Sequence, residues 1–405
     1  MYNRYLSVYK KHYPAKKLAP VLALIIALSP FAIDTYLPAI PTMAAFFSVN
    51  IHLIELSIPL YLIGFALGQL SGGPISDNYG RKWIGIIGMS VFLVASLAVV
   101  FAQSVEQLWV LRFIQAFGGG FGLVICAAIV RDLYDGKDAA KIFTLIGLIM
   151  MIAPLIAPSI GSLLLLAFNW QAIFVLLAVY AFVQIIVIVT LVPETKKLRI
   201  VAGFEPHSFR QVFINYWHIL NNNRALPFLL SSSFVAASMF AFLTEVSFLY
   251  IEYFDVLESK FAWLFALNIL SMMVCNRINH YLLDYWQPVK ILKMGLILQV
   301  CASAFLLSSV FLQAVSLPLT VVLLMVVIGS FGLIAPNNMS SYMHYFPKNS
   351  GAATAVVGSS QYLFGALIGV VLSLLHNDTP LPMFALIFFC SLMGFLSVQL
   401  KKNKE

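Results

Sequence analysis

Apolar runs of about twenty residues alternate with short polar stretches along the whole chain. A helix of about 20 residues crosses the roughly 30 Å hydrocarbon core of a bilayer, whereas barrel strands alternate in polarity over about ten residues. The pattern therefore predicts an all-α integral membrane fold with twelve transmembrane helices. Their approximate ranges are 18–42, 52–76, 83–103, 108–130, 140–166, 170–192, 226–254, 260–283, 288–312, 318–344, 351–375 and 380–400.

The longest polar interruption divides the predicted helices six and six, which indicates two pseudo-symmetric six-helix halves joined by a cytoplasmic linker. Apolar residues recur at helical spacing inside that linker, from Phe209 to Leu220, and predict an amphipathic helix on the membrane surface. A binding site for a partner protein is the alternative for this helix. The predicted divisions are an N-terminal tail at 1–17, a first half at 18–192, the linker at 193–225, a second half at 226–400 and a C-terminal tail at 401–405.

Charge and composition agree with a membrane location. Only 10% of the residues are charged, whereas soluble domains carry about 25%, so a soluble globular protein is excluded. The net charge of +8 comes from Lys and Arg that, except for Arg112, Lys260 and Arg277, fall in tails and loops on one side of the predicted bundle. Cytoplasmic loops carry such an excess. We therefore expect a lipid bilayer as the surroundings, no nucleic-acid partner, and both termini in the cytoplasm.

Candidate metal-binding and catalytic residues are scarce. The cysteines Cys126, Cys275, Cys301 and Cys390 fall inside apolar runs without the spacing of zinc or redox sites. Histidines near span ends, such as His376, show no metal spacing, and no nucleophile is paired with a base at membrane depth. The sequence therefore predicts no metal, no cofactor and no enzymatic activity.

The first apolar run holds one ionisable residue close to its end, Asp34. A charge at membrane depth costs at least about 2.5–3.5 kcal/mol on insertion scales, so an acid there marks a functional site by default. Asp34 is accordingly the candidate proton carrier. A purely structural hydrogen bond to a neighbouring helix or kink is the alternative.

After the second run, residues 73–82 read Gly-Pro-Ile-Ser-Asp-Asn-Tyr-Gly-Arg-Lys, and they resemble the loop signature G-x-x-x-D-x-x-G-R-K of the major facilitator superfamily. Glycines permit a tight turn, an acid can stabilise the start of a helix, and basic residues hold the loop in the cytoplasm. The resemblance implies a loop that closes the inward side in one conformation. The predicted cytoplasmic gate consists of Gly73, Asp77, Gly80, Arg81, Lys82, Arg131 and Asp132.

The fourth run begins with Arg112 and Gln115 and continues into a glycine-rich stretch. It resembles the R-x-x-Q-G-x-G motif of the same superfamily, with Ala116 in place of the first glycine. A rise of about 1.5 Å per residue places Arg112 and Asp34 in the same outer half of the membrane. An arginine favours the charged carboxylate and burial favours the neutral acid, and a proton-coupled switch requires this competition. A static ion pair is the alternative.

The fifth run carries Gly147 and then Pro154, Pro158 and Gly161. These residues resemble the antiporter motif of the drug:proton branch, although alanine and serine replace two of its glycines. Prolines and small residues bend a membrane helix and let a neighbour pack closely. We expect this helix to line an interface between moving parts.

Together with residues 33–39 and 127–134, these motifs resemble the Bcr/CflA (bicyclomycin/chloramphenicol resistance) group of drug:proton antiporters over nearly the whole chain. The resemblance implies an exporter of the bacterial inner membrane that exchanges a small amphipathic compound for protons by alternating access. It further implies that protons are the coupling ion. We expect a monomer.

Glu245 in the seventh run stands where this group usually carries a small residue. Its depth along the helix matches that of Asp34, so we expect both carboxylates to face one cavity, where Glu245 favours a cationic substrate or carries a second proton. Pairing with Arg277 is the alternative. The predicted substrate cavity consists of Phe31, Asp34, Gln115, Phe242, Glu245, Asn268, Gln361 and Phe364.

Two other functions are compatible with the sequence. An exporter of an endogenous metabolite or siderophore would carry the same motifs, since the motifs encode the coupling machinery and not the cargo. A non-transporting membrane receptor is the more distant alternative.

Overall fold

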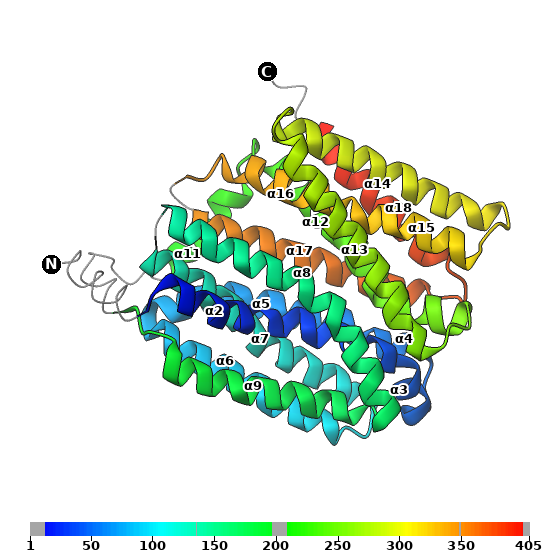
Figure 1. The fold of residues 1–405 in the computed structure, drawn as a ribbon, viewed down its shortest axis with the longest axis horizontal. Helices are drawn as coiled ribbons and strands as arrows, with labels where there is room; N and C mark the ends of the chain where they lie inside the picture. The colour runs from blue at the N-terminus through cyan, green and yellow to red at the C-terminus, as the bar shows by residue number, and fades with distance from the viewer. Residues whose placement is uncertain (1–12, 135, 197–208, 348–349, 400–405) are drawn as a thin grey trace.

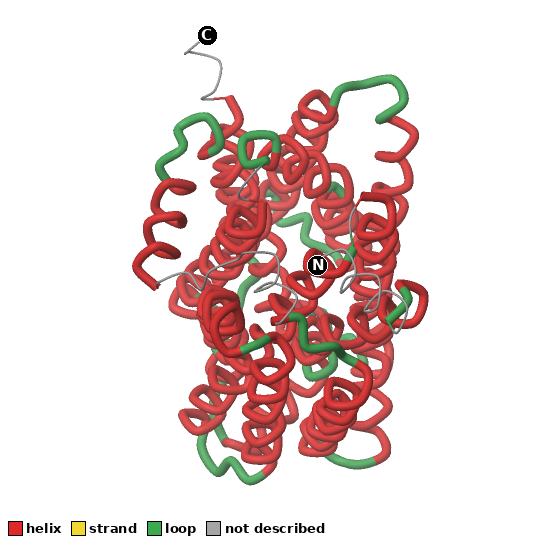
Figure 2. Tube along the Cα trace, turned by 90° about the vertical axis from the view of Figure 1, so that its left-hand side faces the viewer, coloured by secondary structure: helices red, strands yellow, loops and turns green. Residues whose placement is uncertain are grey.

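The computed structural model describes residues 13–134, 136–196, 209–347 and 350–399, and every regular element in these ranges is helical (Figure 1, Figure 2). Twelve of the described helical segments are long and apolar enough to cross a membrane. The predicted fold class is therefore confirmed, and the predicted span limits differ from the observed ones by only a few residues.

The first six spans occupy the lower part of Figure 1. The first span is broken after Asp34, because Pro38 and Pro41 lack the backbone N–H that would continue the helix. Their elements are α2 (Ala15–Asp34), η1 (Leu37–Ala39), α3 (Ile40–Phe47), α4 (Ile51–Glu55), α5 (Ser57–Tyr79), α6 (Arg81–Val100), α7 (Val105–Leu133), α8 (Gly136–Ala167) and α9 (Gln171–Leu191).

The last six spans occupy the upper part of Figure 1. The seventh span continues into a short π-helix, η2, and the tenth span is interrupted at Ser330. Their elements are α12 (Leu226–Ser247), η2 (Phe248–Tyr253), α13 (Glu258–Leu282), α14 (Pro288–Phe311), α15 (Leu317–Gly329), α16 (Phe331–Met343), α17 (Ser350–Leu375) and α18 (Leu381–Gln399).

The two groups of helices meet along a seam. Across it α5 packs against α17, and α8 packs against α13. We call the end of the bundle that carries α11 and the turn between α5 and α6 the linker end, and the end that carries α3 and α4, with η2 packed on α3, the distal end (Figure 1).

A helix between the two groups, α11 (Phe209–Leu220), lies within the predicted amphipathic segment. Ile219 is buried and Tyr216 packs beside it against residues of α17, whereas Trp217 is 65% exposed. The helix is therefore docked on the bundle by one face. Residues 1–12, 197–208 and 400–405, which belong to the predicted tails and linker, lie outside the described residues.

Candidate functional site

Asp34 is the last residue of α2, immediately before the break imposed by the following prolines. The residue is 3% exposed. Its carboxyl group makes no hydrogen bond or ion pair with any residue that the structure describes. The structure thus contains a deeply buried acid without a partner.

Arg112 lies beside the end of α2, as its predicted depth requires, and it is fully buried. Its two terminal nitrogens each donate to the Ala32 carbonyl oxygen at 3.3 Å. The guanidinium carbon lies 4.5 Å from the ring centre of Tyr36 and 4.4 Å from that of Tyr61. Cation–π contacts of this kind contribute about 2 kcal/mol when they are desolvated. Tyrosine rings and a backbone carbonyl therefore hold this cation.

The alternative of a static ion pair between Arg112 and Asp34 is wrong for this conformation, because the arginine bonds α2 at Ala32, two residues before the acid. Counting residues along helices gives the depth of a side chain but not the face on which it lies. The predicted cavity position of Gln115 is also wrong. Its side chain accepts from Arg112 at 2.7 Å and donates to Ser96 on α6 at 2.7 Å, so it positions the arginine inside the first group of helices.

Aromatic side chains line the seam next to Asp34. Tyr61 and Phe65 on α5 stack with ring centres 6.5 Å apart, and Phe65 lies 4.6 Å from Tyr362 on α17. Tyr362 in turn lies 5.4 Å from Phe240 on α12. Tyr61 and Tyr362 both lie close enough to Asp34 to interact electrostatically with its carboxylate. The sequence contains 33 Phe and 17 Tyr, so no single ring could be selected from it.

The remaining predicted cavity residues make their described contacts within their own group of helices. Phe242 is buried and stacks on Phe265, so it belongs to the core and not to a cavity. The other pairs are Phe31 with Tyr180, Asn268 with Tyr250, Gln361 with Ser232 and Phe364 with Phe234. These contacts do not bring the five residues together with Asp34.

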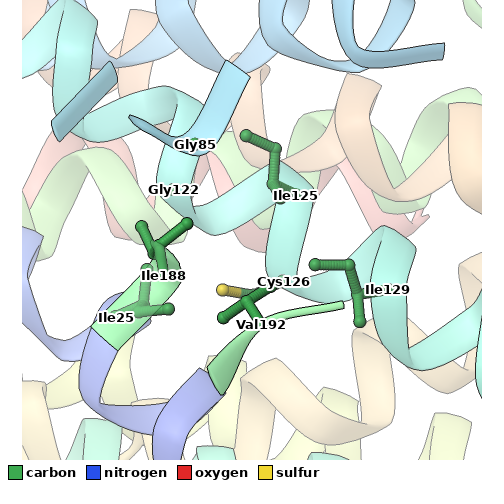
Figure 3. Close-up of a pocket in the computed structure, with 8 residues that line it drawn as sticks. All are labelled: Ile25, Gly85, Gly122, Ile125, Cys126, Ile129, Ile188 and Val192. Atoms are coloured by element: carbon green, nitrogen blue, oxygen red, sulfur yellow. The ribbon is translucent and has the colours of Figure 1, made fainter. Parts of the chain in front are cut away.

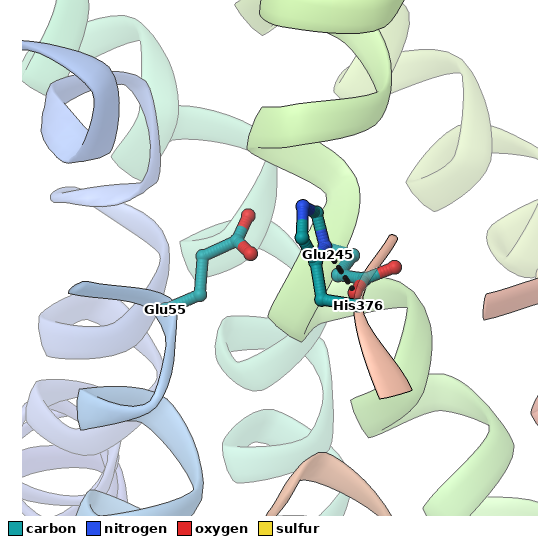
Figure 4. Close-up of side chains that lie close together, drawn as sticks. All are labelled: Glu55, Glu245 and His376. Atoms are coloured by element: carbon teal, nitrogen blue, oxygen red, sulfur yellow. Dashed lines mark hydrogen bonds and ion pairs between the residues drawn. The ribbon is translucent and has the colours of Figure 1, made fainter. Parts of the chain in front are cut away.

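Glu245 does not face Asp34. Its Oε1 atom lies 3.1 Å from Nδ1 of His376, and Glu55 of α4 approaches the same point from the other side of the seam (Figure 4). The predicted shared cavity with Asp34 is therefore wrong, and so is the alternative with Arg277, which donates to the Tyr281 hydroxyl instead. Glu55 carried an available signal, because it is an acid inside a predicted span.

A small apolar pocket lies elsewhere, within the first group of helices (Figure 3). It is lined by Ile25, Gly85, Gly122, Ile125, Cys126, Ile129, Ile188 and Val192. Because hydrocarbon groups line almost all of it, this pocket offers no charge to a cargo and no acid to a proton.

The predicted loop at residues 73–82 is nearly all helical. The α5 helix continues through Tyr79 and α6 begins at Arg81, so Gly80 alone makes the turn with a φ of +111°. Only glycine adopts this conformation without strain. The Arg81 side chain forms ion pairs with Asp77 and, at 3.4 Å, with Asp132 of α7. The motif therefore ties three helices together at the linker end.

Glu194, which the sequence did not single out, completes this turn. Its carboxylate accepts from the backbone N–H groups of Arg81 and Lys82, each at 3.1 Å, and so stabilises the start of α6. Lys82 donates to the Val189 carbonyl oxygen at 2.6 Å. Arg131 extends beyond the turn and lies against Gly351 at the start of α17, across the seam.

The two glycines of the fifth-span motif differ in their surroundings. A Cβ atom at Gly161 would collide with the Thr35 carbonyl oxygen, whereas a Cβ atom at Gly147 would meet no atom within 4 Å. The α8 helix runs unbroken through Pro154 and Pro158. Gly161 therefore lets α8 pack directly on the residue that follows Asp34.

Comparison with known proteins places these features in a family context. The sequence profile described as Major Facilitator Superfamily matches residues 22–370. A bicyclomycin resistance protein homolog of Haemophilus influenzae is 27% identical over 376 residues, which cover 93% of this chain and 94% of that protein. A chloramphenicol resistance protein of Pseudomonas aeruginosa is 28% identical, with 89% of this chain and 86% of that protein covered.

Solved structures show the same fold. The xylose transporter XylE from E. coli, in a partially occluded inward-open conformation, matches with a TM-score of 0.73 at 12% identity, covering 95% of this chain and 96% of that chain. The human organic anion transporter MFSD10 matches with a TM-score of 0.67 at 16% identity, covering 96% of this chain and 100% of that chain. At these identities the likeness concerns the fold alone.

Proposed function

Because this chain belongs to the Major Facilitator Superfamily, we propose that it is a proton-coupled antiporter of the Bcr/CflA group that exports small amphipathic compounds. The chain is a multi-pass membrane transporter and not an enzyme. Relatives named for bicyclomycin and chloramphenicol resistance support drug efflux as its activity. We place it in the bacterial inner membrane as a monomer.

The excess of Lys and Arg in the tails, the linker and the loops beside it supports a cytoplasmic linker end. The distal end then faces the outside. Five of the described hydrogen bonds join the two groups of helices there. Three side-chain hydroxyls donate to backbone carbonyls, Ser247 to Leu37 at 2.7 Å, Ser162 to Glu258 at 3.2 Å and Ser373 to His52 at 3.2 Å. The Thr42 hydroxyl donates to the Glu258 carboxylate and the Phe248 N–H to the Glu55 carboxylate, each at 3.3 Å. In alternating access the two groups would rock about the seam, so these contacts belong to a conformation closed to the outside.

One observation carries the assignment of Asp34 as proton carrier: its buried carboxyl group has no partner among the described residues. A buried carboxylate without a partner costs far more free energy than a buried neutral acid. The closed conformation is therefore suited to a protonated Asp34. Arg112, which donates to the Ala32 carbonyl two residues before Asp34, is held by tyrosine rings and not by a permanent counter-charge.

The proposed cycle follows from this arrangement. Asp34 takes up a proton when the site opens to the more acidic outside, and the neutral acid tolerates burial as the outer side closes. After opening to the cytoplasm it releases the proton, and the carboxylate then attracts Arg112 or a cargo. Proton and cargo must lower each other's affinity by the same factor, because coupling between two ligands is reciprocal.

The aromatic side chains next to Asp34 support an amphipathic cargo. Tyr61, Phe65 and Tyr362 form a surface on both sides of the seam on which a flat or apolar molecule can stack. Aromatic faces also attract organic cations. With an ionised acid beside them, they favour a compound that combines rings with a positive or strongly polar group.

Transport into everted membrane vesicles tests the proposal. We expect an imposed proton gradient to drive uptake of chloramphenicol or tetraphenylphosphonium by the wild-type protein, and we expect Asp34→Asn to abolish this uptake while inserting normally. Asp284→Asn, at an exposed acid of the linker end, is the matched control and should transport normally. Gradient-driven uptake of either compound by Asp34→Asn at the wild-type rate would refute the assignment.

A further inference from the structure

Three titratable side chains meet at the distal end of the seam (Figure 4). Glu55 comes from α4 in the first group of helices, Glu245 from α12 in the second, and His376 follows α17 in the second. One oxygen of each carboxylate and a ring nitrogen of His376 lie within 4.8 Å of one another. Glu55 and Glu245 are each 1% exposed, and the His376 side chain is 4% exposed. We call these three residues the distal cluster.

The existing contacts indicate that His376 carries a charge. Its Nδ1 atom lies 3.1 Å from Glu245 and its Nε2 atom lies 3.3 Å from Asp378. A neutral imidazole has only one N–H, so when Glu245 and Asp378 are both ionised the two contacts are hydrogen bonds only in the imidazolium form. The hydrogen bond to Glu245 is the main cause that raises the pKa of His376 above its ordinary value, and burial opposes it.

The two carboxylates of the distal cluster offer more hydrogen-bond acceptors than the donors around them satisfy. Glu55 accepts from the Phe248 backbone N–H at 3.3 Å with one oxygen, and Glu245 uses one oxygen for His376. The second oxygen of each carboxylate is buried without a partner. The imidazolium balances a single negative charge, so two ionised carboxylates would leave one buried charge uncompensated. One added proton removes that charge and supplies the missing hydrogen-bond donor.

We propose that the distal cluster is a second proton-binding site of this transporter, which takes up one proton from the distal side when the two groups of helices close over it. The proton comes from water and binds a carboxylate oxygen of Glu55 or Glu245, which leaves one negative charge for the imidazolium to balance. This inference rests on the proposed function for one point, that the seam opens at the distal end.

The other titratable groups around the distal cluster do not replace this proton. His52 stacks on His376 with ring centres 5.1 Å apart, and its positive form would oppose the imidazolium. Glu252 and Asp378 add negative charge, but both are exposed and water screens them. Tyr36 faces Glu55, and its hydroxyl group lies 2.7 Å from that of Ser57.

Opening the seam would separate Glu55 from Glu245 and His376, and water would then solvate each carboxylate. The bound proton would leave, so closing and proton uptake are linked. For one proton taken up, the ratio of closed to open molecules changes by at most about tenfold per pH unit. Acid on the distal side therefore closes the outer gate, in the direction that proton-driven antiport requires.

Distance measurements between spin labels test this site without using transport. We would label Gln103→Cys and Ala314→Cys, two exposed loop positions at the distal end on opposite sides of the seam, after replacing Cys275 and Cys301 by alanine. The fraction of molecules with the shorter distance would be followed from about pH 5.5 to 8.5 in the purified full-length protein. Gel filtration would verify that each variant is folded.

In the wild-type protein we expect the closed fraction to fall as the pH rises, by up to about tenfold in the ratio per pH unit for each linked proton. Glu55→Gln and Glu245→Gln should each remove the carboxylate proton from this response, since a neutral amide mimics the protonated acid, and should keep only the part that is due to His376 above about pH 6.5. Asp255→Asn, at an exposed acid of the same end, should behave as the wild type. An unchanged pH response in both glutamine variants would overturn the proposal.

Two further outcomes are decisive. A stoichiometric transition-metal ion in the purified protein, with chelation opening the seam, would make the distal cluster a metal site and overturn the proton-binding proposal. Asp34→Asn should keep the wild-type pH response of the seam. If Asp34→Asn transports normally but the seam still responds to pH through Glu55, the proposed proton carrier fails and the distal site stands.

Discussion

In the part of the chain that the structure describes, buried acids lie in two places that differ in their relation to the seam. Asp34 lies at the end of α2, close to Tyr61 of its own group of helices and to Tyr362 of the other group. The distal cluster takes Glu55 from one group and Glu245 with His376 from the other. Asp34 depends on no acid of the other group, so it can keep its proton while the two groups rock and carry it from one side to the other. Acids on opposite sides of the seam move apart when it opens, so their proton binding depends on the pH at that end.

The largest effect should come from replacing the cation beside Asp34. Arg112→Lys keeps the charge but loses the planar group that donates to Ala32 and Gln115 and stacks between tyrosine rings. Hydrogen bonds to charged groups contribute about 1.5–3 kcal/mol each, so we expect uptake in everted vesicles to fall by at least about tenfold. Arg277→Lys, which changes an arginine bonded only to a tyrosine hydroxyl among the described contacts, is the control. Equal uptake by both variants would show that Arg112 has no special role.

The packing that supports Asp34 gives the next effect. Gly161→Ala places a methyl group against the Thr35 carbonyl, which forces α8 away from the end of α2, and overpacking of this kind costs about 1–3 kcal/mol. We expect a lower melting temperature and slower uptake, with the pH response of the distal cluster retained. Gly147→Ala has open space around it and should be neutral or slightly stabilising, because alanine favours a helix by about 1 kcal/mol over glycine. If Gly161→Ala changes the pH response of the spin-label distance as strongly as it slows uptake, Asp34 and the distal cluster do not act separately.

A smaller effect is expected from His376→Gln. The raised pKa of His376 means that the closed form binds this proton more tightly than the open form. That contribution is fully present below the ordinary histidine pKa of about 6.5 and is lost as the pH rises through the raised value. His376→Gln should therefore flatten the response of the spin-label distance above about pH 6.5. A response identical to that of the wild type would contradict the assigned charge.

The smallest effect concerns the turn at the linker end, which holds neither buried acid. Gly80→Ala forces a side chain into a positive φ and against Glu194, at a cost of about 1 kcal/mol or more. Gly73→Ala meets only a methyl group of Val124 at 3.4 Å and should leave the melting temperature nearly unchanged. Both variants should keep the wild-type pH dependence of uptake, which reports on Asp34, and of the spin-label distance, which reports on the distal cluster. A shifted pH response in either would connect this turn to proton binding.

Hydrophobic patterning predicted the twelve spans and the approximate depth of Arg112, because a bilayer imposes both span length and the rarity of charge. It could not predict that Arg112 would bond Ala32 in place of Asp34, since depth does not fix which face of a helix a side chain occupies. It also paired Glu245 with the wrong acid. Residues 55, 245 and 376 are far apart in the sequence, and only the packing of three elements brings them together.

Motifs located the turn at the linker end and the fifth-span contact but not their physical form. The signature at residues 73–82 indicated a loop, yet a single glycine makes the turn because the helices on either side continue to it. Gly161 was recognised as part of a motif, and the structure explains it as the position where α8 touches Thr35. Glu194 and the aromatic rings near Asp34 belong to abundant residue types, so they carried no signal of their own.

Proton release on cargo binding is the most direct test of Asp34 as the proton carrier. Purified protein in weakly buffered detergent solution would be mixed with chloramphenicol or tetraphenylphosphonium while a pH indicator is followed. The account predicts release of about one proton per bound molecule from the wild-type protein and from Glu55→Gln, and none from Asp34→Asn. The same release from Asp34→Asn as from the wild type would contradict it.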